Sequence, residues 1–185
     1  MEAVVEHRFY TVDEYLELEK HAEVKHEYMD GTLIEMPGES KKANRIAVNL
    51  TVLLDQSLPD YDVYDHDVKL RTTPGKRYRY PDVMVAPSSD ADSDEYVVFQ
   101  AVLLAEITSE NSMETDHHVK LHEYASIQSV QTYLIISQKE VLVEVYQRQG
   151  SKWEFSFYSS LNDVITITQP ALTIRLAVIY HKVSF

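Results

Sequence analysis

The sequence predicts an α/β (α+β) fold in which a mixed central sheet is flanked by helices. Three observations lead to this fold class. Apolar residues recur at helical spacing across 40–58, "SKKANRIAVNLTVLLDQSL". Segments 61–73 and 78–87 then alternate polar and apolar residues or run apolar, as strands do. Finally, a helical segment at 112–127 separates two long apolar runs, an order that usually joins parallel strands through a helical crossover.

Length and composition are those of one globular domain over residues 1–185. Apolar residues make up 44% and charged residues 25%, and the absence of cysteine excludes disulfides, thiolate metal sites and a cysteine nucleophile. The opening "MEAVVEHRFY" has neither the basic flank nor the apolar stretch of a signal peptide, and no segment approaches the roughly 18 apolar residues of a membrane span. We therefore expect a cytoplasmic protein that does not span a membrane.

The formal net charge of −13 weighs against nucleic-acid binding by the whole surface, because phosphate binding is largely electrostatic. A local basic surface remains compatible with it. Acidic residues also gather where a divalent cation is held, so the same charge fits either a metal site or an ordinary soluble surface.

The N-terminal elements are predicted to be a short helix and a hairpin. Thr11 and Glu14 have the spacing of a capping box at the start of "YTVDEYLELEKH". In "VKHEYMDGTLIEM", the pair Asp30-Gly31 separates two short runs, and both residues tolerate the positive φ of a hairpin turn. A longer helix follows, and its apolar positions form one face over about four turns: Ala43, Ile46, Ala47, Leu50, Leu53, Leu54 and Leu58.

Strand patterns follow this helix. "YDVYDHDVKLRTT" and "YRYPDVMVAP" are joined by the turn "PGKR", and we expect them to pair antiparallel. The uninterrupted apolar core of "VVFQAVLLAEITS" predicts a strand buried on both faces. After the helical segment, "VQTYLIIS", "VLVEVYQRQ" and "WEFSFYS" are predicted strands, and a loosely patterned tail completes the chain.

Two acids stand at the ends of the central strands. Asp82 is near the start of one strand and Glu106 near the end of the next long apolar one. If these strands are antiparallel neighbours, the two carboxylates meet at one edge of the sheet, where they repel each other and raise a pKa unless a cation lies between them. Two carboxylates suit Mg²⁺. Each acid taken alone is more often a solvated or capping residue, and it is the pair in this order of elements that favours a metal site.

The stretches "YPDVMV" and "LLAEITS", in this order of elements, resemble the PD-(D/E)XK nuclease superfamily. More closely, the chain resembles a large bacterial family of predicted restriction endonucleases, known as a domain of unknown function. The family's other pieces are similar to "YTVDEYLELE", "KHEYMDGTLIEMPG", "NRIAVNL", "KLHEYASI" and "VEVYQR", from about Tyr10 to Tyr180. The resemblance implies a restriction-endonuclease-like core and a DNA endonuclease that depends on Mg²⁺, for which Mn²⁺ can substitute.

The resemblance also implies roles for individual residues. Asp82 and Glu106 would bind the metal, with help from the main-chain carbonyl of Ile107. Thr108 stands where the superfamily pattern has a lysine. Lys120, in the following helix, where the family's helix also carries a lysine, is therefore the candidate for a migrated catalytic lysine.

Other positions leave alternatives open. Lys120 can instead form a surface ion pair with Asp116, four residues earlier. Glu27 matches an acid that the family places on the entry hairpin. There it would act as a catalytic residue by binding metal or positioning water. The alternative is an exposed hairpin acid without a catalytic role. Ala43 stands in a segment where the family often carries histidine, which favours an altered or weakened site.

Basic residues at the start of the long helix and near the turn between strands are candidates for a lip that contacts the DNA backbone, or else solvated side chains: Lys41, Lys42, Arg45, Lys76, Arg77 and Arg79. Two functions therefore remain open. One is a Mg²⁺-dependent DNA endonuclease, and the other is a catalytically inactive nuclease fold that serves as a binding or assembly domain. A homodimer is compatible with either.

Overall fold

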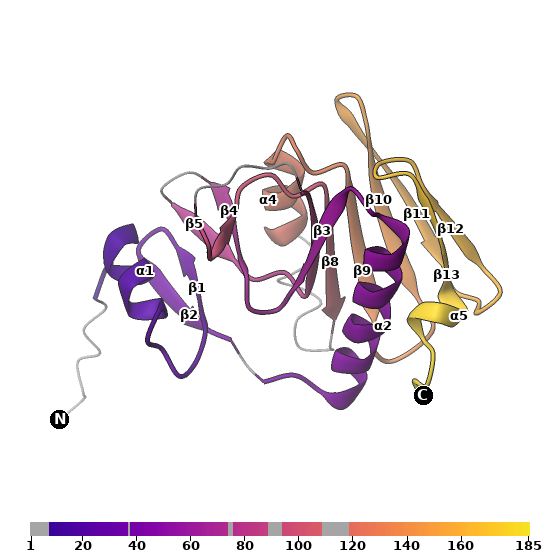
Figure 1. The fold of residues 1–185 in the computed structure, drawn as a ribbon, viewed down its shortest axis with the longest axis horizontal. Helices are drawn as coiled ribbons and strands as arrows, with labels where there is room; N and C mark the ends of the chain where they lie inside the picture. Colours follow the sequence, from indigo (N-terminus) through magenta and orange to yellow (C-terminus); the bar gives the residue numbers. More distant parts are fainter. Residues whose placement is uncertain (1–7, 37, 74–75, 89–93, 109–118) are drawn as a thin grey trace.

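A six-stranded mixed sheet forms the centre of the protein (Figure 1). The computed structural model describes residues 8–36, 38–73, 76–88, 94–108 and 119–185. The sheet has the order β11-β10-β9-β8-β6-β3, with β3 (Tyr61–Asp65), β6 (Val83–Pro87), β8 (Leu103–Thr108), β9 (Thr132–Ser137), β10 (Val143–Gln149) and β11 (Lys152–Tyr158). All neighbours are antiparallel except β8 and β9, which are parallel. The predicted mixed sheet is confirmed.

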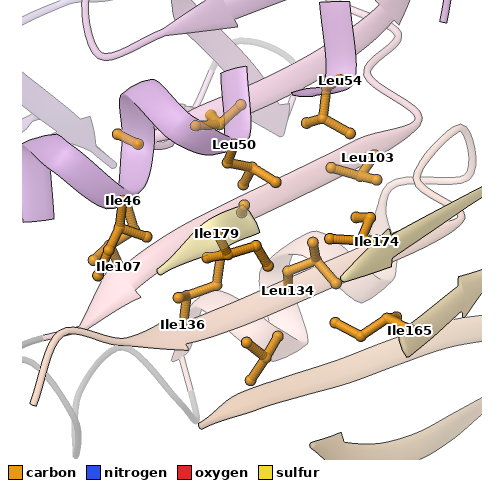
Figure 2. Packing of buried hydrophobic residues seen from close by; sticks show 14 of the residues in the cluster. Ile46, Leu50, Leu54, Leu103, Ile107, Leu134, Ile136, Ile165, Ile174 and Ile179 are labelled. Atoms are coloured by element: carbon orange, nitrogen blue, oxygen red, sulfur yellow. The ribbon is translucent and has the colours of Figure 1, made fainter. Parts of the chain in front are cut away.

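One face of this sheet is covered by α2 (Lys41–Ser57), which Ser40 caps by accepting a hydrogen bond from the main-chain N–H of Ala43 at 3.0 Å. Its apolar side chains lie in one buried cluster with residues of β6, β8 and β9, and Figure 2 shows those of β8 and β9 beside the helix. Ile46, Leu50 and Leu54 are all fully buried. Each such side chain contributes about 1.5–3 kcal/mol to folding, which makes this face the main core of the fold.

The C-terminal segment completes this core. β12 (Val164–Ile167) and β13 (Leu172–Arg175) form a separate hairpin, and the short helix α5 (Leu176–Ile179) follows it. Ile165, Ile174 and Ile179 are fully buried in the same cluster as α2 (Figure 2). The tail that appeared loosely patterned in the sequence is therefore part of the main core.

A second, five-stranded sheet carries the N-terminal elements, in the order β2-β1-β5-β4-β7. Its strands are β1 (His26–Met29), β2 (Thr32–Glu35), β4 (Lys69–Thr73), β5 (Arg77–Arg79) and β7 (Val97–Val98). The predicted hairpin is present, with φ of 48° at Asp30 and 96° at Gly31. The predicted helix is α1 (Val12–Glu19), with both hydrogen bonds of the Thr11–Glu14 capping box. Tyr15 attaches α1 to this sheet by stacking on Tyr28, with ring centroids 5.0 Å apart.

The expectation of one continuous strand in each of 61–73 and 78–87 is wrong. Each segment breaks into two strands that belong to different sheets: β3 and β6 lie in the central sheet, whereas β4 and β5 lie in the five-stranded one. The first break is at His66, whose φ is +29°. The second is at Pro81, which lacks the N–H that a ladder needs. Asp82 therefore lies at the corner where the chain passes from one sheet to the other.

The helix α4 (Leu121–Ser126) covers the other face of the central sheet (Figure 1). Tyr124 is fully buried there and contacts Tyr133 of β9 edge to face, with ring centroids 5.2 Å apart. Of the helical segment predicted at 112–127, residues 112–118 lie outside the described part of the chain. Within the described residues, no helix combines the length and the apolar character needed to cross a membrane.

Candidate active site

Strand pairing brings Asp82 and Glu106 to the same edge of the central sheet. Val83 of β6 pairs with Ala105 of β8, so Asp82 and Glu106 occupy the next position along each strand. The main-chain N–H of Ile107 donates a hydrogen bond to Asp82 Oδ2 at 2.6 Å, which fixes the Asp82 carboxylate against β8. The antiparallel arrangement needed for the two acids to meet is thus present.

Glu106 points to the face of the sheet that α4 covers, where Tyr124 contacts it, and the residue is 5% exposed. The hydroxyl of Tyr124 donates to Oε1 at 2.7 Å, and the ammonium of Lys120 donates to Oε2 at 3.0 Å. Burial raises the pKa of Glu106 to about 7; Lys120 opposes this rise, while the charge of Asp82 adds to it. A perturbed carboxyl group with specific charged neighbours is common at functional sites.

Lys120, immediately before α4, lies between two acids from different elements. Its Nζ is 3.0 Å from Glu106 Oε2 and 3.9 Å from Glu27 Oε1 on β1. The side chains of Lys120 and Glu27 are each 12% exposed. The structure therefore brings three of the predicted residues together, and Asp116, the alternative partner of Lys120, lies outside the described residues.

Arg79 connects Glu27 to α4. Its guanidinium is 2.6 Å from Glu27 Oε2 and 2.8 Å from Glu123 Oε2. Arg79 was expected in an exposed basic lip, but it is 4% exposed, and its charge is taken up by these two buried carboxylates. It lies inside the protein as the central ion of a buried network, and this corrects the expectation. Removing one member of such a network leaves an uncompensated buried charge.

The other basic residues of the predicted lip lie in two places. Lys41, Lys42 and Arg45 are exposed at the start of α2. Lys76 is exposed in the turn before β5, and the adjacent Arg77 forms a 2.8 Å ion pair with Asp30 of the hairpin. These basic residues therefore come from two different elements, and their role in contacting DNA stays a prediction.

His66 and Glu39 are site residues that the sequence reasoning missed. Asp65 of β3 pairs with Val83, which puts His66 beside Asp82. His66 Nδ1 is 3.6 Å from Asp82 Oδ1 and 3.0 Å from Oε1 of Glu39, which precedes α2. The carboxylates of Asp82 and Glu39 raise the pKa of His66 to about 10. The only signal in the sequence was the acid–His–acid run "YDHD", since the partners come from segments far apart in the chain.

The carboxylate oxygens at this edge are the kind of ligand that suits a hard divalent cation. Mg²⁺ takes oxygen ligands and commonly uses one or two carboxylates together with water and substrate phosphate. Asp82 and Glu106 supply such carboxylates from paired strand positions, and the side chain of Asp82 is 16% exposed, so it reaches solvent while Glu106 stays buried. Ile107 follows Glu106 on β8, and its main-chain N–H contacts Asp82.

Comparisons with known proteins agree with the fold. A family model described as "Putative restriction endonuclease", Uma2, matches residues 12–178. Two uncharacterized proteins of Synechocystis are similar: sll1609 is 33% identical over 82% of this chain and 88% of its own length, and slr1290 is 28% identical over 94% and 92%. The crystal structure of a putative nuclease of the DUF820 group from Anabaena variabilis superposes with a TM-score of 0.74 at 20% identity, over 92% of this chain and 97% of that one. The match across nearly the whole chain shows that this protein belongs to the Uma2 family of putative restriction endonucleases.

Proposed function

We propose that this protein is a metal-dependent DNA endonuclease that hydrolyses phosphodiester bonds. The observation that carries the proposal is the meeting of Asp82, Glu106 and Lys120 at one edge of the central sheet, with Lys120 Nζ 3.0 Å from Glu106. The family, and the fold shared with a putative nuclease, support the same class of activity.

Asp82 and Glu106 would bind Mg²⁺ or Mn²⁺, with the Ile107 carbonyl as a further ligand. The bound ion supplies Lewis-acid stabilisation of the charge that develops on the scissile phosphate. The hydrogen bond from Tyr124 to Glu106 Oε1 orients this carboxylate, so that Oε2 faces Lys120. Ile107 performs the equivalent task for Asp82 by binding Oδ2. Both acids are thus held in place before the ion binds.

Lys120 would orient the attacking water or contact the phosphate. An ammonium beside the reacting phosphate stabilises negative charge without reorganisation, provided that its position is fixed. Glu27 holds Lys120 from the β1 side at 3.9 Å, and Arg79 in turn holds Glu27 at 2.6 Å. We therefore assign Glu27 a positioning role in which it places the lysine.

The DNA backbone would be bound by the exposed Lys41, Lys42 and Arg45 at the start of α2 and by Lys76 in the turn before β5, together with the half-buried Arg77. Because the net charge is −13, this attraction is local and would weaken steeply as salt increases.

The test is nicking of supercoiled plasmid with Mg²⁺ or Mn²⁺. Asp82→Asn, Glu106→Gln and Lys120→Ala should each lower the nicking rate by about 100-fold or more, the size of loss seen when one preorganised electrostatic group is removed. Lys152→Ala is the matched control, since Lys152 is exposed on β11, at the far edge of the sheet. Equal nicking by wild type and all three site variants would reject the proposal and indicate a contaminating nuclease.

An inactive binding or assembly domain is the second candidate, favoured by Thr108 in place of the pattern's lysine and by the acidic charge. It predicts no cleavage of any DNA by wild type and no rise of the melting temperature with Mg²⁺ or Mn²⁺. In that case the site variants would change only stability.

A further inference from the structure

We propose that Glu39, His66 and Asp82 form a second cation site, one that selects a divalent first-row transition metal such as Co²⁺ or Zn²⁺ over Mg²⁺. One ligand atom from each residue lies within 4.8 Å of the other two. Ligands at about 2.0–2.2 Å from an ion are roughly 3–4.4 Å apart, so small side-chain movements bring all three into the coordination range.

Three separate parts of the chain build this group. Glu39 immediately precedes the cap of α2, His66 is the corner between β3 and β4, and Asp82 is the corner between β5 and β6. The two corners are joined through the main chain, because the N–H of His66 donates to the carbonyl of Asp82 at 3.4 Å. The relative positions of His66 and Asp82 are therefore set by the backbone of the sheet.

Each ligand presents one defined atom. Asp82 Oδ2 is bound by the N–H of Ile107, which leaves Oδ1 to face the imidazole. The imidazole approaches both carboxylates through Nδ1, whereas its Nε2 is buried and has no hydrogen-bond partner among the described residues. Nδ1 is thus the nitrogen that can bind an ion at this place.

The ligand set determines the class of ion. Mg²⁺ prefers an all-oxygen shell, whereas an imidazole with carboxylates suits Zn²⁺ and neighbouring transition metals. The side chains of His66 and Glu39 are 25% and 31% exposed, so solvent ions can reach the site and water can fill the remaining positions. In the absence of a metal ion, an ion pair between a protonated His66 and the two acids occupies the same place.

The second site shares Asp82 with the proposed active site. Its effect on DNA cleavage rests on the proposed function, whereas the binding of the ion does not. An ion bound to His66 would reduce the negative charge around Asp82 and approach the same phosphate. Binding of the ion is independent of whether DNA is cleaved, which allows the two proposals to fail separately.

The experiment is titration of the whole chain with Co²⁺ at pH 8, followed by calorimetry and by visible absorption. Wild type should bind Co²⁺ through His66, and His66→Asn should weaken that binding by at least about tenfold, since loss of a ligand exceeds the tenfold cost typical of losing a supporting hydrogen bond. Asparagine tolerates the positive φ of His66, so this variant keeps the corner. His21→Asn, at a histidine that is 80% exposed on its side chain, is the control and should leave Co²⁺ binding unchanged.

The other variants separate the two proposals. Glu39→Gln should weaken Co²⁺ binding, whereas Glu106→Gln should abolish Mg²⁺-dependent nicking and leave the His66-dependent Co²⁺ site in place. Co²⁺ binding that is absent in wild type, or unchanged in His66→Asn, overturns the second site even if nicking is seen. Absence of nicking together with His66-dependent Co²⁺ binding rejects the nuclease and retains the site.

Discussion

Glu106→Gln should remove a loss of stability that wild type shows as pH rises, because the buried Glu106 carboxylate is costly to ionise. The pKa of Glu106 is raised from 4.5 to about 7 in the folded protein, chiefly by burial. Between these two values the folded state binds a proton that the unfolded state has lost, so the free energy of unfolding falls as pH rises through this window and is constant above it. Glutamine has no proton to lose and lacks this dependence.

The magnitude follows from the same two pKa values. Ionising Glu106 in the folded protein costs on the order of 3 kcal/mol relative to the unfolded chain, at about 1.36 kcal/mol for each pKa unit. Relative to wild type, the glutamine variant should therefore gain roughly 2–3 kcal/mol in free energy of unfolding between pH 5 and pH 8. The hydroxyl of Tyr124 can donate to the amide oxygen as it does to Oε1, so the variant keeps this contact.

The assay is urea denaturation of both proteins in EDTA at several pH values. Titrations far from Glu106 affect both proteins equally, so the difference between them reports on Glu106 and its charged neighbours. Glu154→Gln, at an exposed position on β11, should follow the wild-type curve at every pH. A difference in free energy of unfolding between Glu106→Gln and wild type that is constant with pH would show that this carboxyl group is not buried as the structure has it. The same conclusion would follow if the variant lost stability relative to wild type as pH rises.

Three further outcomes are expected. Arg79→Leu should cost up to about 3–5 kcal/mol in urea denaturation, because two buried carboxylates lose their nearest cation and keep only the more distant Lys120 and Arg77; a loss under 1 kcal/mol would mean that the network is solvated. Tyr124→Phe removes a donor to the Glu106 carboxylate and should raise the pKa of Glu106 further, which NMR titration of the side chain can measure; a lower pKa would contradict the contact. Replacing Lys41, Lys42 and Lys76 by alanine should weaken DNA binding and reduce the slope of log affinity against log salt by up to about 3, and an unchanged slope would place the DNA elsewhere.

Local sequence signals predicted the elements whose structure depends on neighbouring residues. The capping box of Thr11 and the turn at Asp30-Gly31 both appear as expected, because cap and turn geometry is determined within a few residues. The antiparallel meeting of Asp82 and Glu106 was also predictable, since it needs only the order and direction of two strands.

Features that depend on distant partners were not predictable in this way. The strand pattern continues through His66 and Pro81, so it gave no sign that each segment is shared between two sheets. Arg79 looked like a surface residue because the carboxylates that bury it, Glu27 and Glu123, are 52 and 44 residues away in the chain. The Glu39–His66 contact is likewise formed only when α2 and the β3–β4 corner pack together.

If the proposed function holds, the acidity of the edge gives bound cations a role in DNA binding as well as in chemistry. Four carboxylates gather there, from Glu27, Glu39, Asp82 and Glu106, and they face three cationic groups, those of Lys120, His66 and Arg79. When all of these groups are charged, the local balance is negative, and a phosphodiester approaching within a few Å would be repelled. Divalent ions would reverse this balance at the place that the proposed function gives to the scissile phosphate. Under that proposal, metal dependence of DNA binding at this edge should accompany metal dependence of cleavage, whereas the lysines at the start of α2 would contact the backbone with or without the ion.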